Sequence, residues 1–424
     1  MTCLPERPRH YPGMAGQRRW QLALVLLVTF FVGYLDRLNI TFAVPLMAAE
    51  FSWNETQTRD YGSLLMGLFY AGYGLANILL TPVAVKLGPR RSLLIIIVLW
   101  SLFTALGAWV SQWLLALMAT RVLLGVSEGV HVPVMSQLTK TWFPLEERAR
   151  ANSIFVSGLF LAVLLSPIML VPLMSDYGWR TGFVLVALFG LLISLPLVAT
   201  LVHDTPESHP DISPRELAHI AAGRAREAAG EVVELSWGAL FSMPRFLLLS
   251  VIGSINNVVA LGLSSWLPTY FTTKRGIAFE EITYLVAVPY AFSLLGIGLW
   301  AWLGDRHNIR SPLAALGFAG AGIMIYLALQ ADSLATVLLC FSLGVFLISA
   351  FNACEFAMLQ RIVPLQMVAP AMGVYNGCTT IIGGGLGPFI VSPIISQDGL
   401  SWLISAIALG NAALLLLAYR LIRY

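Results

Sequence analysis

Long apolar segments recur along the whole chain, and they limit the possible folds more than any other feature. Each segment has roughly 18–25 residues, the length that a helix needs to cross a hydrocarbon core about 30 Å thick. We predict twelve such spans, at 20–44, 60–84, 92–110, 113–137, 150–174 and 180–201, then 245–272, 282–304, 312–330, 334–357, 369–393 and 400–421. Backbone groups in lipid must be hydrogen-bonded internally, and the alternating pattern of a barrel is missing, so the spans should be helices.

Composition and charge agree with a multi-pass membrane protein. The 424 residues are 58% hydrophobic and 11% charged, whereas soluble domains carry about 25% charged residues. If both termini are cytoplasmic, most Lys and Arg residues lie in cytoplasmic segments. The segments on the other side of the membrane contain only Arg59, Arg180, Lys274 and Arg275. This bias predicts the orientation. Compact loops and tails favour a bacterial inner membrane.

One long polar stretch, from His203 to Pro244, divides the chain into two similar parts. We predict a cytoplasmic tail (1–19), a six-helix bundle (20–202), a linker (203–244) and a second six-helix bundle (245–424). In the linker, Ser213 and Glu216 have the spacing of a capping box; the helix that follows is either a tether or a surface helix. The halves also share short motifs, since Val363-Pro364-Leu365 repeats Phe143-Pro144-Leu145, and Asp398-Gly399 resembles the Asp176 region.

Four charged residues interrupt the apolar spans. Asp36 and Arg37 lie within 20–44, and Arg121 and Glu128 lie within 113–137. A charge near the middle of a bilayer costs at least about 2.5–3.5 kcal/mol on insertion scales. Such residues persist where they face an interior cavity, form pairs or bind a charged substrate. They indicate a transporter.

The permanent charge and planar fork of Arg37 suit it to a substrate carboxylate; the alternative is a structural pair with Asp36. Adjacent residues on a helix diverge by about 100°, which disfavours that pair. Asp36 is either a proton site or a counter-ion. Arg121 and Glu128 are seven residues apart on one helical face, so each should meet a neighbouring helix.

Several motifs resemble the major facilitator superfamily, and more narrowly its anion:cation symporter family. The motifs are Tyr34-Leu35-Asp36-Arg37-Leu38-Asn39, Arg121 with Gly125, Glu128 and Gly129, Trp142-Phe143-Pro144, Gly178-Trp179-Arg180, Trp266-Leu267-Pro268-Thr269-Tyr270, Gly304-Asp305-Arg306, and Gly373 with Asn376. The resemblance implies an all-α membrane protein of two pseudo-symmetric six-helix bundles that work by alternating access.

The resemblance also implies roles for individual residues. Arg37 would bind the substrate carboxylate, Glu128 would couple to protons and Arg121 would position it. Tyr73 and Asn376 would face the cavity, although Tyr73 is as consistent with simple aromatic packing. Asn256 and Asn352 are candidates from polarity alone, and His131 either modulates Glu128 or packs in the core.

Two positions depart from the family pattern. Val85 replaces an acidic residue in the loop before Arg90, whereas the second half keeps Asp305-Arg306. We expect Arg90, Asp305 and Arg306 to form conformational latches, one of them weakened. Leu159 stands where sugar-acid symporters often have glutamine, which favours a less hydroxylated carboxylate.

The resulting hypothesis is a proton-coupled symporter of a small organic anion, acting as a monomer. The alternatives are an exporter of a metabolite, siderophore or drug in the same fold, and a transporter-shaped sensor. The sequence has no phosphate-binding loop, no metal-ligand spacing and no nucleic-acid platform. We therefore expect no enzyme activity, cofactor or metal, and no nucleic-acid partner.

Overall fold

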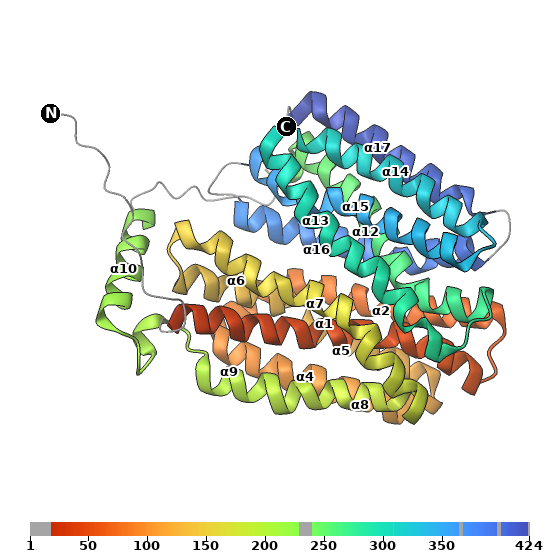
Figure 1. Cartoon of the computed structure of the whole chain (residues 1–424). Helices are drawn as coiled ribbons and strands as arrows, with labels where there is room; N and C mark the ends of the chain where they lie inside the picture. Colours follow the sequence, from red (N-terminus) through yellow and green to blue (C-terminus); the bar gives the residue numbers. More distant parts are fainter. Residues whose placement is uncertain (1–17, 229–239, 308, 364–367, 397–399, 423–424) are drawn as a thin grey trace.

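The computed structural model describes residues 18–228, 240–307, 309–363, 368–396 and 400–422, and these residues are predominantly helical (Figure 1). In the first half the helices are α1 (Arg18–Glu50), α2 (Glu55–Leu79), α3 (Thr81–Leu87), α4 (Pro89–Trp109) with η2 (Val110–Gln112), α5 (Leu114–Glu128), α6 (His131–Trp142), α7 (Leu145–Tyr177), α8 (Trp179–Phe189), η3 (Gly190–Ser194) and α9 (Leu195–Leu201). After the linker helix α10 (Pro214–Ala228), the second half contains α12 (Pro244–Thr269) with η5 (Tyr270–Lys274), η6 (Phe279–Glu281), α13 (Ile282–His307), α14 (Arg310–Gln330), α15 (Leu334–Ile362), α16 (Val368–Ser396) and α17 (Trp402–Ile422).

Twelve spans within the described residues are long and apolar enough to cross a membrane, which confirms the predicted number. The second span differs from its prediction, since α2 begins at Glu55 and ends at Leu79 rather than covering 60–84. Its early start has a local cause: the Asn54 side chain accepts from the Gln57 amide at 2.8 Å, and the Gln57 side chain accepts from the Asn54 amide at 3.0 Å. This reciprocal capping box fixes the helix start.

The predicted 113–137 span consists of two helices, α5 and α6, with a break directly after Glu128. Close packing on α2 accompanies this break. A Cβ on Gly129 would overlap the Tyr73 carbonyl oxygen, and a Cβ on Gly125 would overlap the Phe69 carbonyl oxygen. Glycines therefore let α5 lie against the α2 backbone, the arrangement that small residues permit in membrane helices.

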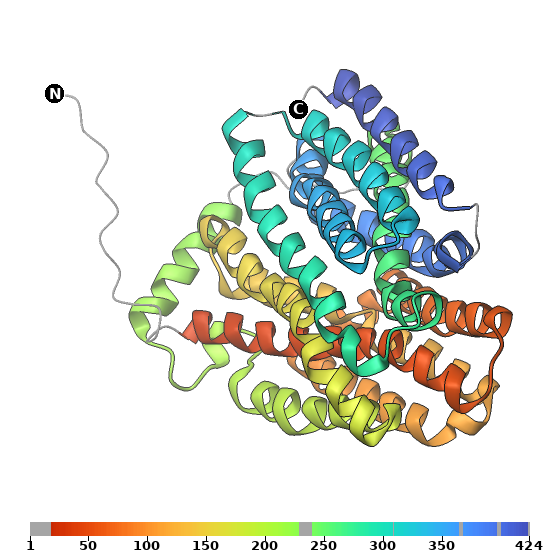
Figure 2. The ribbon, with the colours of Figure 1, turned by 45° about the vertical axis from the view of Figure 1, so that its right-hand side comes forward.

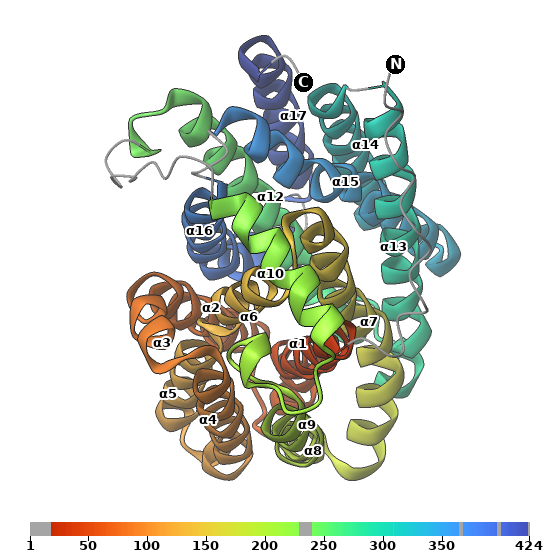
Figure 3. The same cartoon turned by 90° about the vertical axis from the view of Figure 1, so that its left-hand side faces the viewer.

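The two halves form two adjacent bundles, as the view from the α10 end shows (Figure 3). Three helix pairs join them: α2 with α16, α7 with α13, and α1 with α12. The C-terminal helices are inclined to the N-terminal ones, and the halves converge at the end away from α10 (Figures 1 and 2). There, Ser63 Oγ donates to the Pro388 carbonyl at 3.1 Å, and Ser175 Oγ donates to Glu280 at 3.0 Å.

The linker helix α10 is bound to the first half. The Glu216 carboxylate accepts from the Arg19 guanidinium at 3.0 Å and from the backbone amides of Arg18 and Arg19, both at 3.1 Å. Ser213 Oγ accepts from the Glu216 amide at 3.1 Å, so the serine side of the capping box is present. The Glu216 side chain, however, turns to the start of α1. The described part of the linker is therefore a docked helix rather than a loose tether.

Other predicted features lie outside the described residues. They are Pro364, Leu365, Asp398 and Gly399 of the internal repeat, and most of the 1–19 tail.

Candidate functional site

An ion pair between α1 and α5 forms the centre of the first bundle. Arg37 Nε donates to Glu128 Oε2 at 2.6 Å, and the two side chains are 5% and 0% exposed. The spacing argument predicted that Glu128 would meet a neighbouring helix, and it does. The partner of Arg37 is thus Glu128 and not Asp36. A buried pair of this kind persists only with good geometry, because both ions lose their hydration.

Aromatic rings surround the Arg37 guanidinium. Its carbon lies 4.5 Å from the ring centroid of Tyr34, 4.4 Å from that of Tyr73 and 5.8 Å from that of Phe69. A cation over the face of an aromatic ring is attracted by the ring quadrupole, more strongly where water is excluded. Tyr73 therefore contacts the predicted anchor directly. The cage partly replaces the hydration that the guanidinium has lost.

Asp36 points away from Arg37, toward α4. Thr104 Oγ1 lies 2.7 and 2.6 Å from the two Asp36 carboxylate oxygens, and Asn39 Nδ2 donates to Asp36 Oδ1 at 3.0 Å. Both partners were missed by the sequence argument. The three-residue spacing of Asn39 from Asp36 was a usable indication, since such residues are neighbours on a helix. Thr104 is one of the scattered hydroxyl residues of an otherwise apolar run, and nothing in the sequence singled it out.

Arg121 has no direct ion pair to Asp36 or Glu128 among the described contacts. Its Nε donates to the Leu65 carbonyl of α2 at 3.2 Å, and its guanidinium carbon lies 5.1 Å from the Phe69 ring centroid. It interacts electrostatically with both Asp36 and Glu128. Two arginines and two carboxylates thus form one charged network in the first bundle.

Several polar atoms of this network have no hydrogen-bond partner among the described residues. They are Arg37 Nη2, Arg121 Nη1, Glu128 Oε1 and Asn39 Oδ1, all buried. Buried polar groups are nearly always paired. Two unpaired guanidinium nitrogens next to a displaceable carboxylate are the chemistry that an anionic ligand requires.

The candidates from the second half form a separate group. Asn256 Nδ2 donates to Asn352 Oδ1 at 3.1 Å and to Asn257 Oδ1 at 3.2 Å, linking α12 to α15. Asn376 lies half-buried on α16, and its backbone carbonyl accepts from Thr379. No described contact joins Asn256 or Asn376 to Arg37. Whether they bind substrate stays a prediction.

The predicted latch residues are bound in ways that the sequence did not indicate. Arg90 donates through its amide to Asp204 at 2.7 Å and through its guanidinium to the Ala199 carbonyl at 2.6 Å. Both partners belong to the first half and its linker. Asp204 was missed; it places a carboxylate at the start of α4, where the helix dipole favours one. Arg306 is exposed beside Trp302, and the side chain of Asp305 lies outside the described residues, so the latch between halves stays a prediction.

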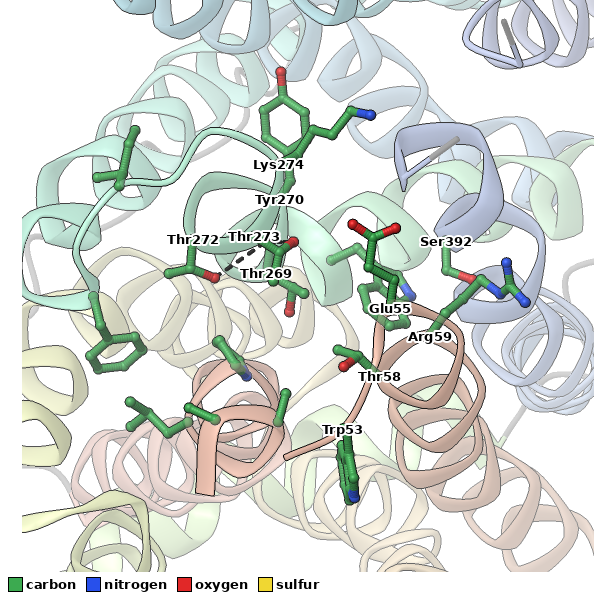
Figure 4. A pocket seen from close by; sticks show the side chains of 17 residues that line it. Trp53, Glu55, Thr58, Arg59, Thr269, Tyr270, Thr272, Thr273, Lys274 and Ser392 are labelled. Carbon is green, nitrogen blue, oxygen red and sulfur yellow. Dashed lines mark hydrogen bonds between the residues drawn. The ribbon is translucent and has the colours of Figure 1, made fainter. Parts of the chain in front are cut away.

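A cavity of about 410 Å³ opens between the halves at the end away from α10 (Figure 4). The α1–α2 loop and α2 contribute Trp53, Glu55 and Arg59, and the end of α12 with η5 contributes Thr269 and Lys274. Trp266 lines this cavity, its ring packs against Gly62, and its indole donates to the Pro388 carbonyl at 2.9 Å. The residues of the charged network are not among those that line this cavity.

The part of the chain that the structure describes contains no cluster of three His, Cys, Asp or Glu side chains that could hold a metal ion.

Comparison with known proteins agrees with this architecture. Residues 26–388 match the model of the Major Facilitator Superfamily. A probable sulfoacetate transporter of Cupriavidus necator is 27% identical over 407 residues, which cover 92% of this chain and 91% of that protein. A probable chloroplastic anion transporter of rice is 26% identical over 334 residues, covering 76% of this chain and 55% of that longer protein.

A solved structure shares the fold. The crystal structure of a D-xylose–proton symporter superposes with a TM-score of 0.75 at 15% identity, covering 93% of this chain and 97% of that one. The matched family model and the two-bundle architecture confirm the predicted fold, and the anion-transporting relatives agree with the predicted anion:cation symporter branch. The chain belongs to the Major Facilitator Superfamily.

Proposed function

We propose that the protein is a proton-coupled symporter of a small organic anion with a carboxylate group. The observation that carries this proposal is the buried Arg37–Glu128 pair, in which one polar atom of each partner has no hydrogen bond among the described residues. A substrate carboxylate and the Glu128 carboxylate would compete for the same guanidinium. Protonation of Glu128 removes its charge and frees Arg37 for the substrate.

This competition for Arg37 couples the movement of protons to the movement of the substrate anion. When Arg37 is paired with an ionised Glu128, its positive charge is compensated and no ligand is needed. With Glu128 protonated, an anion is needed to balance Arg37, because an uncompensated buried charge is costly. Asp36, held by Thr104 and Asn39, supplies a second carboxylate that the substrate does not displace. We assign it to proton binding with Arg121 as the positioning residue.

Alternating access would expose this site in turn to each side of the membrane. The packing of Trp266 against Gly62, across the two halves, supports a state in which the end away from α10 is closed. We place the α10 end, with both termini, in the cytoplasm of a bacterium, following the distribution of Lys and Arg. The relative's named substrate, sulfoacetate, carries a carboxylate and directs the first choice of ligand.

The test is uptake of labelled sulfoacetate, acetate and glucuronate into proteoliposomes, with and without an inward proton gradient. We expect the gradient to drive accumulation of at least one acid. Glu128→Gln should keep exchange of labelled for unlabelled substrate but lose gradient-driven accumulation, since an amide side chain cannot take up and release the coupling proton. Arg37→Lys should lose both, since an ammonium lacks the planar fork.

The matched control is Arg91→Lys, an exposed arginine at the start of α4, which should behave as wild type. Gradient-independent uptake by the wild-type protein, or full coupling in Glu128→Gln, would contradict the mechanism. Proton-driven efflux of a neutral or cationic compound, without uptake of any acid, would favour the exporter.

A further inference from the structure

A second buried polar cluster lies beside the charged network. Its members are Trp100 and Ser101 on α4, His131 at the start of α6, and Ser194 in η3, and we name it the His131 cluster. All four residues are 0% exposed. Trp100 Nε1, Ser101 Oγ, both ring nitrogens of His131 and Ser194 Oγ have no hydrogen-bond partner among the described residues.

Packing shows that these groups are close together. A Cβ on Gly190 would overlap Ser101 Oγ and lie 2.8 Å from Trp100 Nε1, so both polar atoms gather at the glycine that begins η3. The Trp100 and His131 ring centroids are 5.1 Å apart. Ser194 ends the same π-helical turn that Gly190 begins, and such turns occur frequently at functional sites.

The cluster adjoins the charged network on three helices. Trp100 and Ser101 lie one turn from Thr104, the residue that binds Asp36. Gly33, three residues before Asp36, lies against the His131 ring, with its Cβ position 3.6 Å from Nδ1. His131 itself follows Glu128 by three residues. On each helix the cluster is on the α10 side of the network.

The charged group that acts electrostatically on His131 is Arg37. Asp36 and Glu128 are the carboxylates within one turn of the cluster, and Arg121 lies beside them. Two aromatic rings also lie near the His131 ring: Phe30, with the centroids 5.8 Å apart, and Trp100.

We propose that the His131 cluster binds ordered water and passes protons between the carboxylates and the α10 end. Buried polar groups are nearly always paired with protein or with ordered water, and a buried water makes about three hydrogen bonds. Two hydroxyls, an indole N–H and an imidazole provide donors and acceptors for such waters. An imidazole can accept a proton at one ring nitrogen and release one from the other, so no net charge accumulates. The transport part of this proposal rests on the proposed function.

Hydration is tested without any transport assay by radiolytic hydroxyl-radical footprinting of the purified protein with mass spectrometry. Ordered water next to a side chain produces radicals that oxidise it. Trp142 is the matched control: it is 1% exposed, and its indole donates to the His203 carbonyl at 3.0 Å. We expect Trp100 to be oxidised roughly fivefold faster than Trp142, because only its indole would be next to bound water. Equal or slower oxidation of Trp100 would overturn the proposal.

Variants separate the water site from the proton path. Ser101→Ala with Ser194→Ala removes two hydroxyls from the site and should lower Trp100 oxidation toward that of Trp142. The same variant should slow proton-driven accumulation while substrate exchange stays unchanged. Ser166→Ala is the control, since that buried hydroxyl is paired with the Val163 carbonyl at 3.3 Å and should change neither measurement.

The outcomes distinguish the two proposals. Fast Trp100 oxidation in a protein that transports no anion would support the water site and contradict the proposed function. Coupled transport with a protected Trp100 would support the function and overturn the water site. Full proton-driven accumulation in the double serine variant would overturn the proton path.

Discussion

The Arg37 guanidinium is stabilised within the membrane by Glu128 and by the aromatic rings around it. Under the proposed function, its carboxylate partner can still be exchanged for a substrate carboxylate. Arg37 Nε donates to Glu128, while Arg37 Nη2 has no hydrogen-bond partner within the described part of the chain. The tyrosine faces provide attraction without acting as competing anions. A fully paired arginine would offer nothing to a substrate, and an unpaired one would be too costly to bury.

Removing Arg37 alone should destabilise the protein more than removing both partners. We expect Arg37→Met to lower the free energy of unfolding by about 3–5 kcal/mol, because it leaves Glu128 buried and uncompensated. The double variant Arg37→Met with Glu128→Leu should recover most of that loss. Denaturant titration of the purified protein measures both.

The control is Arg59→Met, which breaks the exposed pair with Asp60 and should change stability by about 0–1 kcal/mol. A double variant as unstable as Arg37→Met would show that the destabilisation comes from lost packing around the guanidinium.

Charged residues of the site were predictable from the sequence, because a charge inside an apolar run needs an explanation. Their partners were less so. Thr104 and the Leu65 carbonyl belong to helices, and Asp204 to the segment after α9, and no local pattern specifies how these parts pack on their partners.

At the scale of elements, helix crossings are set by glycines. Gly125 and Gly129 bring α5 against the backbone of α2, and Gly384 lies against the Tyr70 ring where α16 meets α2. Helix α16 runs unbroken from Val368 to Ser396 in spite of its glycines and prolines. Gly383 and Gly387 of this helix lie against α12, so they permit close packing there.

Alanine substitution distinguishes packing glycines from others. Gly125→Ala should destabilise the protein by about 1–3 kcal/mol, because its methyl group would overlap the Phe69 carbonyl and force the helices apart. Gly298→Ala, on α13, meets nothing within 4 Å and should stabilise the helix by up to about 1 kcal/mol. Thermal unfolding compares the two. If both variants changed the stability equally, the α2–α5 crossing would be able to adjust to the added methyl group.

Helix number and approximate limits were predictable, since a span must match the bilayer thickness. The break after Glu128 and the π-helical turn at Gly190–Ser194 were not. Both depend on contacts with other helices rather than on local composition.

For the whole molecule, sidedness is the main expectation to test. We expect Cys at position 273, in a Thr273→Cys variant lacking the native cysteines, to react in intact cells with a membrane-impermeant maleimide. Thr273 is exposed at the end away from α10, where the cavity opens. An Arg91→Cys variant should react only after the membrane is permeabilised. The reverse pattern would invert the predicted topology.

The two-bundle arrangement followed from the linker position and the short repeats. The docking of the linker was not predictable from the sequence. Its contacts form only after folding, because Arg18 and Arg19 lie far along the chain from Glu147 and Glu216.

The docking of α10 bears on how this transporter could be divided into co-expressed pieces. A fragment ending at Val202 would leave the start of α4 without the Asp204 carboxylate and Arg19 without Glu216. A fragment ending at Ala228 would keep both. The amino-terminal fragment should therefore include the linker helix α10 as well as its six membrane helices. A split of the gene, natural or engineered, should give two fragments that assemble when it lies after α10, and fragments that assemble poorly when it lies before α10.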